Sequence, residues 1–230
     1  NVMRKYYPRG WLPQSAEEEA HWNPSSIVMS QTGRFHYMWF DTQHSLADWV
    51  RASPAHQAWV TRIMTEAFRR DRNMNTFAIH LFIDAFPSGW MKTIMDVDRQ
   101  PKPAYFTYRD ALEPLAANLH CVRKAFFSGE TVRVAAWLCN DTAAPLTGGT
   151  LRYQIEVGNR VVQCGAASAA VPACDSAFQG WLEFPAPPTS QRTNMTVRLA
   201  VFSADGRRLH DTALALDLFG PAPPPVAQRV

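Results

Sequence analysis

The stretch Thr76-Phe77-Ala78-Ile79-His80-Leu81-Phe82-Ile83-Asp84 is a nearly continuous apolar run with the length of one β-strand. A strand that is apolar on both faces is typical of a parallel sheet buried between helices, whereas a half-buried strand alternates apolar and polar residues. The segment Asn73-Met74-Asn75 before it has the composition of a turn. Residues 76–84 therefore predict a buried strand of an α/β structure.

Helical patterns flank this predicted strand on both sides. Ser53 and Pro54 suit the N-cap and the first position of a helix that continues to about Arg70. After the strand, a second helical pattern begins at Pro103 and continues to Leu112. Helix, buried strand, loop and helix together make the repeat of an α/β barrel. The order therefore predicts the terminal strand-helix part of a TIM barrel, residues 1–115.

The first forty residues have little periodicity and are rich in aromatic residues and proline. Such composition is typical of long loops that pack on a neighbouring scaffold. Ser15 and Glu18 have the spacing of a capping box, which predicts a short helix there. The aromatic cluster 35–40 is interpreted as a cover over the barrel mouth or, alternatively, as a border of a ligand pocket. We expect the chain to be part of a longer protein.

Beyond Pro114 the sequence changes to short runs of alternating apolar and polar residues separated by turn signals. About seven strands in roughly 100 residues are typical of an immunoglobulin-like β-sandwich. This predicts a sandwich over residues 116–220 and a loose Pro-rich tail over 221–230. The clearest runs are 131–138, 150–157, 178–184, 195–202 and 208–218, and the turn signals are Ser128-Gly129, Gly148-Gly149, Gly158-Asn159 and Asp205-Gly206.

Composition is that of an ordinary globular protein, with 47% hydrophobic and 19% charged residues. The net charge of +3 is scattered, and its densest cluster is Arg69-Arg70-Asp71-Arg72. We interpret that cluster as a solvated helix end, where cations suit the helix dipole, rather than as a nucleic-acid site. No apolar run approaches the ~20 residues of a membrane span. The sequence therefore predicts a soluble, cytoplasmic protein without a membrane or nucleic-acid partner.

Four cysteines, Cys121, Cys139, Cys164 and Cys174, lie in the second half of the chain. Their spacing fits neither a paired zinc motif nor a dense disulfide framework, so we interpret them as buried thiols. A single disulfide between Cys164 and Cys174 is the alternative. The histidines show no metal-ligand spacing, and Gly-rich phosphate loops and serine-hydrolase elbows are absent from the sequence. No cofactor or metal is expected.

Several segments resemble glycoside hydrolase family 2, the β-galactosidases, β-mannosidases and β-glucuronidases. The resemblance rests on Ile79-His80-Leu81-Phe82-Ile83-Asp84-Ala85-Phe86-Pro87, on Met95-Asp96, on residues 102–114, and on Trp137-Leu138-Cys139-Asn140-Asp141. In that family the eighth barrel strand ends in an aromatic and Asn-Asp segment, and a Lys-Pro or Lys-Ala helix leads out into a β-sandwich. The chain departs from the family where His80 replaces a tryptophan, Ile83 replaces the asparagine and Phe86 replaces the tryptophan before proline.

The resemblance implies a retaining β-glycosidase that uses two glutamates on the fourth and seventh barrel strands, the first within an Asn-Glu pair. None of the glutamates here follows Asn or ends a barrel-like strand; Glu66, for example, is expected to face out of its helix. The catalytic pair is therefore expected upstream of Asn1, and the chain alone is expected to be inactive. The glutamates are Glu17, Glu18, Glu19, Glu66, Glu113, Glu130, Glu156 and Glu183.

Residues at the end of the predicted strand are the candidates for the wall of the sugar pocket, because barrel active sites lie at the C-terminal ends of the strands. His80, Phe82, Asp84 and Trp90 are there. Asp84 can accept hydrogen bonds from sugar hydroxyls, and Trp90 offers a flat face to a pyranose ring. Alternatively, Asp84 is a structural carboxylate and His80 a core histidine.

A second interpretation is a non-catalytic carbohydrate-binding or assembly module built on the sandwich. Trp137 and Trp181 are its candidate platform, although their pattern favours the core for both. Under the first interpretation, residues 76–84 expose strand edges. The expected partners are therefore a carbohydrate substrate and either the rest of the parent enzyme or further copies of the chain.

Overall fold

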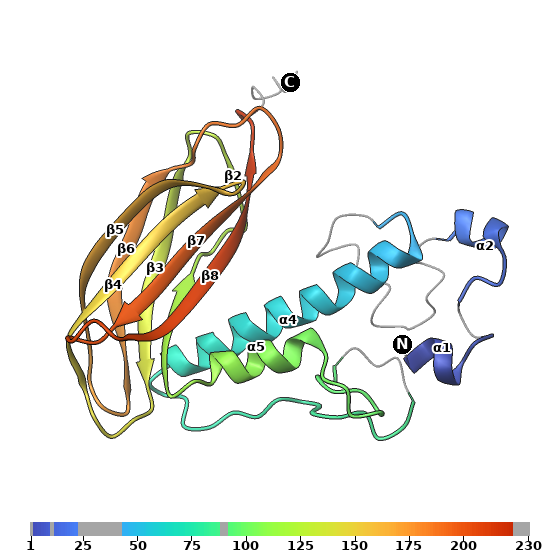
Figure 1. Ribbon diagram of the computed structural model, residues 1–230, viewed down its shortest axis with the longest axis horizontal. Helices are drawn as coiled ribbons and strands as arrows, with labels where there is room; N and C mark the ends of the chain where they lie inside the picture. The colour runs from blue at the N-terminus through green and yellow to red at the C-terminus, as the bar shows by residue number, and fades with distance from the viewer. Residues whose placement is uncertain (1, 10–11, 23–42, 88–91, 223–230) are drawn as a thin grey trace, which may run out of the picture. The chain divides into compact units, whose positions relative to one another are not determined.

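A computed structural model describes residues 2–9, 12–22, 43–87 and 92–222. The chain divides into two compact units, the first made of residues 1–65 and 76–112 and the second of residues 66–75 and 113–230. The predicted aromatic cover 35–40, Trp90 and residues 223–230 of the tail lie outside the described residues. The helices are α1 Val2–Tyr6, α2 Ala16–Ala20, α4 Leu46–Arg70 and α5 Pro103–Ala111 (Figure 1).

The short helix α2 confirms the capping signal near the N-terminus. Ser15 is the N-cap, and its hydroxyl accepts a hydrogen bond from the Glu18 amide. The Glu18 carboxylate accepts from the amide of Gln14 rather than from that of Ser15, so the capping box is shifted by one residue. Helix α5 begins at Pro103 as predicted, because proline needs no hydrogen-bond partner at the first helical position.

The long helix α4 begins earlier than the sequence predicts. Ser45, not Ser53, provides the cap, because its Oγ accepts a hydrogen bond from the Asp48 amide at 3.1 Å. Pro54 then lies inside the helix, where it leaves one backbone carbonyl without its usual helical donor. The helix tolerates this loss because the remaining hydrogen bonds of a 25-residue helix hold both sides of the proline in register.

Residues 76–84 do not form the predicted buried strand. Within the described part of the chain, their one β-type contact is the parallel bridge between Ile83 and Met95. Most residues of the stretch are exposed. A strand exists only where a neighbour completes its hydrogen bonds, and here the backbone bonds to the 93–95 segment begin only at Leu81, whose oxygen accepts from the amide of Ile94. The hydrophobic pattern is therefore present without the sheet that it predicts.

The second unit is a sandwich of eight strands within the described residues (Figure 1). One sheet has the order β1-β3-β6 and the other β2-β8-β7-β4-β5. All pairings are antiparallel except that of β2 with β8. This strand order is the one found in immunoglobulin-like sandwiches. The strands are β1 Leu115–His120, β2 Ala125–Phe127, β3 Thr131–Asn140, β4 Leu146–Val157, β5 Arg160–Val171, β6 Asp175–Pro185, β7 Thr193–Phe202 and β8 Arg208–Phe219.

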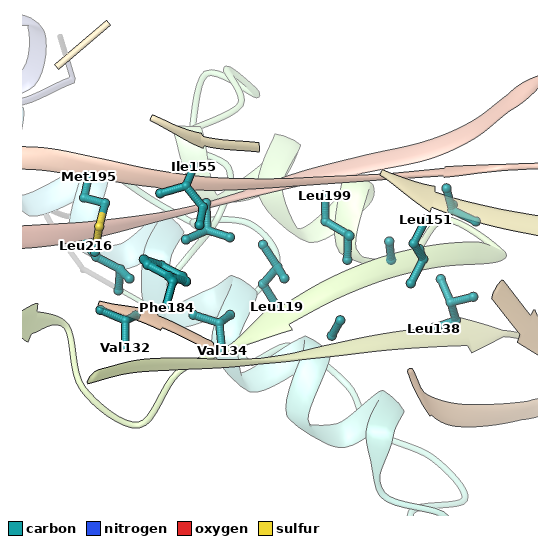
Figure 2. Close-up of a cluster of buried hydrophobic side chains, with 14 of the residues drawn as sticks. Leu119, Val132, Val134, Leu138, Leu151, Ile155, Phe184, Met195, Leu199 and Leu216 are labelled. Atoms are coloured by element: carbon teal, nitrogen blue, oxygen red, sulfur yellow. The ribbon is translucent and has the colours of Figure 1, made fainter. Parts of the chain in front are cut away.

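The sandwich core lies between the inner faces of its two sheets. Figure 2 shows Val132 and Val134 from one sheet and Ile155 and Met195 from the other pointing into the space between the layers. All four side chains are fully buried. Each such side chain stabilises the fold by about 1.5–3 kcal/mol relative to an exposed one, so this alternation of inward apolar residues fixes the strand register.

The turn signals are confirmed at three of their four positions. Gly158 and Gly206 have positive φ, which suits the hairpin turns from β4 to β5 and from β7 to β8, and Gly129 has positive φ in the turn before β3. Gly148-Gly149 is the exception, because it lies inside β4 at a register shift. A Cβ on Gly149 would come within 2.9 Å of the carbonyl oxygen of Phe202. That glycine serves close strand packing rather than a turn.

All four cysteines are free thiols in the structure. The prediction that they are buried is correct for Cys139 and wrong for Cys164 and Cys174, which are exposed. Cys164 lies on β5, an edge strand of the five-stranded sheet, within a run of exposed residues from Arg160 to Cys164. None of the helices in the described ranges combines the length and the apolar character needed to cross a membrane.

Candidate functional site

Among the predicted sugar-site residues that the structure describes, Asp84 is the most enclosed. Its carboxylate is buried and lies 3.5 Å from Nζ of Lys102. The same ammonium donates a hydrogen bond to Oγ1 of Thr93, whose backbone oxygen accepts a hydrogen bond from Nε2 of Gln57 at 2.8 Å. Burial lowers the pKa of Lys102, and the charge of Asp84 opposes that shift. Asp84 thus belongs to a small polar cluster within the first unit.

Backbone hydrogen bonds hold the Asp84 segment in place. The amides of Asp84 and Met95 donate to the oxygens of Met95 and Phe82, at 3.1 and 3.0 Å. The amide of Lys102 donates to the oxygen of Ile94 at 2.9 Å, and the Ile94 side chain is fully buried. Three short segments from different parts of the first unit are therefore joined where Asp84 and Lys102 meet.

Phe82 and His80 are more exposed than Asp84. Phe82 is half exposed, and its ring lies 6.1 Å from that of Tyr105 in an edge-on arrangement. His80 is exposed and so does not lie in a core, and the peptide bond between His80 and Leu81 is cis. Leu81 and Phe86 are also exposed. Phe82 and Asp84, two residues apart, therefore differ in exposure: the Phe82 ring is half exposed and the Asp84 carboxylate is buried.

Glu66 does not face out of its helix. Its side chain is buried, and a carboxylate oxygen lies 3.9 Å from the Arg70 guanidinium. Its partner at the i+4 position explains the burial, because a buried carboxylate needs a nearby cation or donor. Within the described ranges, His, Cys, Asp and Glu side chains form no group of three or more suited to a metal ion.

The basic cluster at the end of α4 is not a solvated helix end. Arg69 is 5% exposed, and its guanidinium binds the Asp141 carboxylate after β3 at 2.8 Å. Arg72 binds Asp175 of β6 at 2.6 Å but is 68% exposed. The helix dipole therefore explains less of this cluster than its carboxylate partners on the sandwich do. Spacing along the chain gave no sign of those partners, which lie 72 and 103 residues away.

Arg70 covers part of the outer face of the three-stranded sheet. Its Nη1 donates to Oδ1 of Asn118 on β1 at 3.0 Å, and its backbone oxygen accepts from the hydroxyl of Ser176 on β6. Asn118 donates in turn to the sulfur of Cys139. Burial lowers the pKa of Arg70, and the charge of Glu66 opposes the shift. Residues 66–75 and the sandwich are therefore one packed unit.

The same outer face carries aromatic side chains that the sequence assigned to the core. Trp181 is 48% exposed, Phe178 is 44% exposed and Trp137 is partly exposed. On β3, Val134 and Leu138 point inward into the core. Because side chains alternate between the two faces of a strand, Trp137 lies on the outer face. The prediction that both tryptophans are core residues is wrong.

The fold places the chain in a class of proteins in which a unit with helices precedes an immunoglobulin-like sandwich. Helix α4 ends within the sandwich unit, and α5 is followed directly by β1. The exo-chitosanase CsxA of Amycolatopsis orientalis has a similar structure, with a TM-score of 0.61 and 16% identity over 87% of this chain and 24% of that chain. The β-D-mannosidase of Dictyoglomus thermophilum has a TM-score of 0.61 and 16% identity over 96% of this chain and 26% of that one.

These similarities confirm, at the level of the fold, the resemblance to glycoside hydrolase family 2, of which both proteins are members. The chain spans about a quarter of the length of each. No protein-family model matches the sequence, and no curated protein matches it. At 16% identity, the likeness concerns the arrangement of the backbone.

Proposed function

We propose that this chain is the C-terminal region of a retaining β-glycosidase of glycoside hydrolase family 2. Residues 1–115 would form the end of its (β/α)8 barrel and residues 116–220 the following sandwich. The hydrolysed bond is an O-glycosidic bond, and the two catalytic carboxylates belong to a part of the enzyme that these residues do not include. The rest of the enzyme is then the main partner of the chain. Alternatively, further copies of the chain form a homo-oligomer that covers the edges of the proposed barrel strand 76–84.

The extent of the structural likeness carries this proposal. Sandwiches of this type occur in many unrelated proteins, so a match to the sandwich alone would say little about activity. The similarity to the exo-chitosanase and the β-D-mannosidase covers 87% and 96% of the chain and therefore extends well into the first unit. One exo-chitosanase structure is a complex with p-nitrophenyl-β-D-glucosamine, which supports a β-linked sugar as the substrate here.

The exposed apolar stretch 76–84 is consistent with a strand of a barrel whose neighbouring strands belong to other parts of the enzyme. Leu81, Phe82 and Phe86 are exposed, and none of the strands of the described residues includes residues 76–84. Burying such a stretch between parallel neighbours would satisfy both its backbone and its side chains. In such a barrel, the Phe82 ring would pack on the sugar, and Lys102 would hold Asp84 at the end of the strand. His80 and Trp90 would be further residues of the wall of the sugar pocket.

The test uses the parent protein and p-nitrophenyl β-D-glucosaminide, β-D-mannoside and β-D-galactoside as substrates. We expect the parent to hydrolyse at least one of them with retention of anomeric configuration, and the 230-residue chain to give no turnover. Phe82→Ala in the parent should raise KM about tenfold, because one buried aromatic contact is worth ~1.5–3 kcal/mol. Phe106→Ala, an equally exposed ring on α5, is the matched control. A parent that hydrolyses none of the three substrates would contradict the proposal.

The second candidate function is a non-catalytic carbohydrate-binding or assembly module. The observation in its favour is the exposure of Trp181 and Phe178 on the sandwich. It differs from the first candidate in that it needs no active site. A parent protein without glycosidase activity that still binds oligosaccharides through the sandwich would favour this second candidate.

A further inference from the structure

The outer face of the three-stranded sheet is built in rows that cross β1, β3 and β6. One row contains Cys139 and Ser176, and the end of α4 lies against it through Arg70. The next row pairs Asn118 with Trp137 and Trp137 with Phe178. The outer face is thus divided into a part that α4 covers and a part beyond it that the described residues leave exposed.

The open part is aromatic. The rings of Trp137 and Phe178 are 5.4 Å apart, and those of Phe178 and Trp181 are also 5.4 Å apart. In the adjacent row, Trp181 lies opposite the small residue Ala135, which lies opposite His120 on β1. We call Trp137, Phe178 and Trp181 the aromatic patch. Its rings support one another and leave almost half of two of them in contact with water.

An ion pair borders the aromatic patch at its free end. The guanidinium of Arg133 lies 4.3 Å from the centre of the Trp181 ring, and its Nε is 3.0 Å from the carboxylate of Glu183. The stacked guanidinium fixes the orientation of the indole. Both charged side chains are more than half exposed and keep polar surface toward solvent. Because their charges are opposite, this border has no net charge.

We propose that the aromatic patch, together with Arg133 and Glu183, binds a neutral oligosaccharide. A pyranose ring presents an apolar face that packs on aromatic rings and a rim of hydroxyls that donate to a carboxylate and accept from a guanidinium. A nucleic acid would need a cationic surface, and this one is balanced. A stable protein interface uses roughly 20–30 residues a side, whereas this patch has three rings and one ion pair and is bounded by α4.

This binding surface goes beyond the proposed glycosidase function, because it contains no catalytic group and lies on the sandwich. It would hold a polymeric substrate near the enzyme and raise its effective concentration. Hydrolysis of a small aryl glycoside needs only the catalytic residues and their pocket, so the loss of that activity and the loss of oligosaccharide binding by the patch are separate outcomes. The two proposals can therefore fail independently of each other.

The experiment titrates the complete 230-residue chain with mannohexaose and with cellohexaose, followed by calorimetry and by the NMR signals of the indole N–H groups. We expect one of the two probes to bind and to shift the Trp181 signal. Trp181→Ala and Phe178→Ala should raise Kd at least about tenfold, because each removes a ring whose burial is worth ~1.5–3 kcal/mol. Phe106→Ala removes a ring that is also 44% exposed, but on α5, and should leave Kd unchanged.

Three results would overturn the inference. The first is the absence of binding of both probes at millimolar concentration by the folded chain. The second is binding that is equally strong in Trp181→Ala, with urea unfolding showing that the variant remains folded. The third is self-association of the chain that Trp181→Ala abolishes while neither sugar binds, since the patch would then serve a second copy of the protein.

Discussion

The guanidinium of Arg69 binds the carboxylate of Asp141 at 2.8 Å, although the two side chains differ greatly in exposure, 5% against 62%. The cation is enclosed at the end of α4, whereas the carboxylate remains in contact with water. A buried charge that loses its partner cannot easily regain its hydration, whereas an exposed one can. Breaking the ion pair should therefore cost free energy mainly through the loss of a partner for the buried Arg69 guanidinium.

The first prediction concerns the removal of that partner. Asp141→Asn should lower the free energy of unfolding by about 1–2 kcal/mol, because it removes the charge of the carboxylate that pairs with the buried guanidinium. Asp175→Asn is the matched control, since its partner Arg72 is 68% exposed and can be hydrated again; it should cost at most about 0.5 kcal/mol. Urea unfolding of both variants gives the comparison. Equal losses would show that the burial of Arg69 has no energetic consequence.

The second prediction concerns a glycine inside β4. Gly149→Ala would place a Cβ 2.9 Å from the oxygen of Phe202 and 3.2 Å from that of Ala169, both backbone atoms on paired strands. The strands must move apart, so we expect a loss of about 1–3 kcal/mol in the free energy of unfolding. In Gly165→Ala the new Cβ meets the ring of Tyr153, a side chain that can rotate, and the loss should be smaller. Thermal unfolding that ranks the two variants in the opposite order would contradict this account.

Local signals in the sequence were sufficient for much of the sandwich and for α5. Alternation over 208–218 corresponds to β8, and Pro103 marks the start of α5, because period and proline act within a few residues. The start of α4 was predicted wrongly for the same reason. Pro54 suits the first turn of a helix, so the start was placed there, whereas the helix begins after the cap at Ser45. Residues 76–84 failed differently. Their pattern is that of a strand, but strand formation depends on neighbours that no local pattern supplies.

The candidate site was less accessible from the sequence than the fold. Asp84 was predicted as a site candidate from its place after the apolar stretch, but no spacing rule predicts its contact with Lys102, 18 residues later. Arg69 looked like a helix-end cation because its carboxylate partner comes from the sandwich. Trp181 was assigned to the core from its alternation pattern, although Phe184, which lies three residues later and points inward, places Trp181 on the opposite face.

The third prediction concerns His120. Burial, and then the positive charge of Arg70, lower the pKa of His120 below its ordinary value of about 6.5. The unfolded chain therefore binds a proton at a higher pH than the folded one does. Its contribution to stability is complete above pH 6.5 and is lost as the pH falls below that value. Between pH 7.5 and 5.5, the wild type should lose stability relative to His120→Gln.

Two measurements check the behaviour of His120. An NMR titration of its ring protons should give a pKa below the ordinary value, and Arg70→Gln should raise that pKa by removing a nearby positive charge. Urea unfolding at the two pH values should show the difference between the wild type and His120→Gln shrinking in acid. A pKa at or above the ordinary value would contradict the burial of the ring against Arg70.

The last prediction concerns the ion pair of the first unit. Burial already lowers the pKa of Lys102, and the Asp84 charge limits that shift; Asp84→Asn should therefore lower the pKa further. The variant also removes the carboxylate that pairs with this largely enclosed ammonium, so the free energy of unfolding should fall by about 1–3 kcal/mol. Asp98→Asn is the control, because its partner Lys5 is exposed and little change is expected. Titration of the Lys102 side chain by NMR and urea unfolding test both points, and a Lys102 pKa that does not move would mean that Asp84 holds its place through its backbone alone.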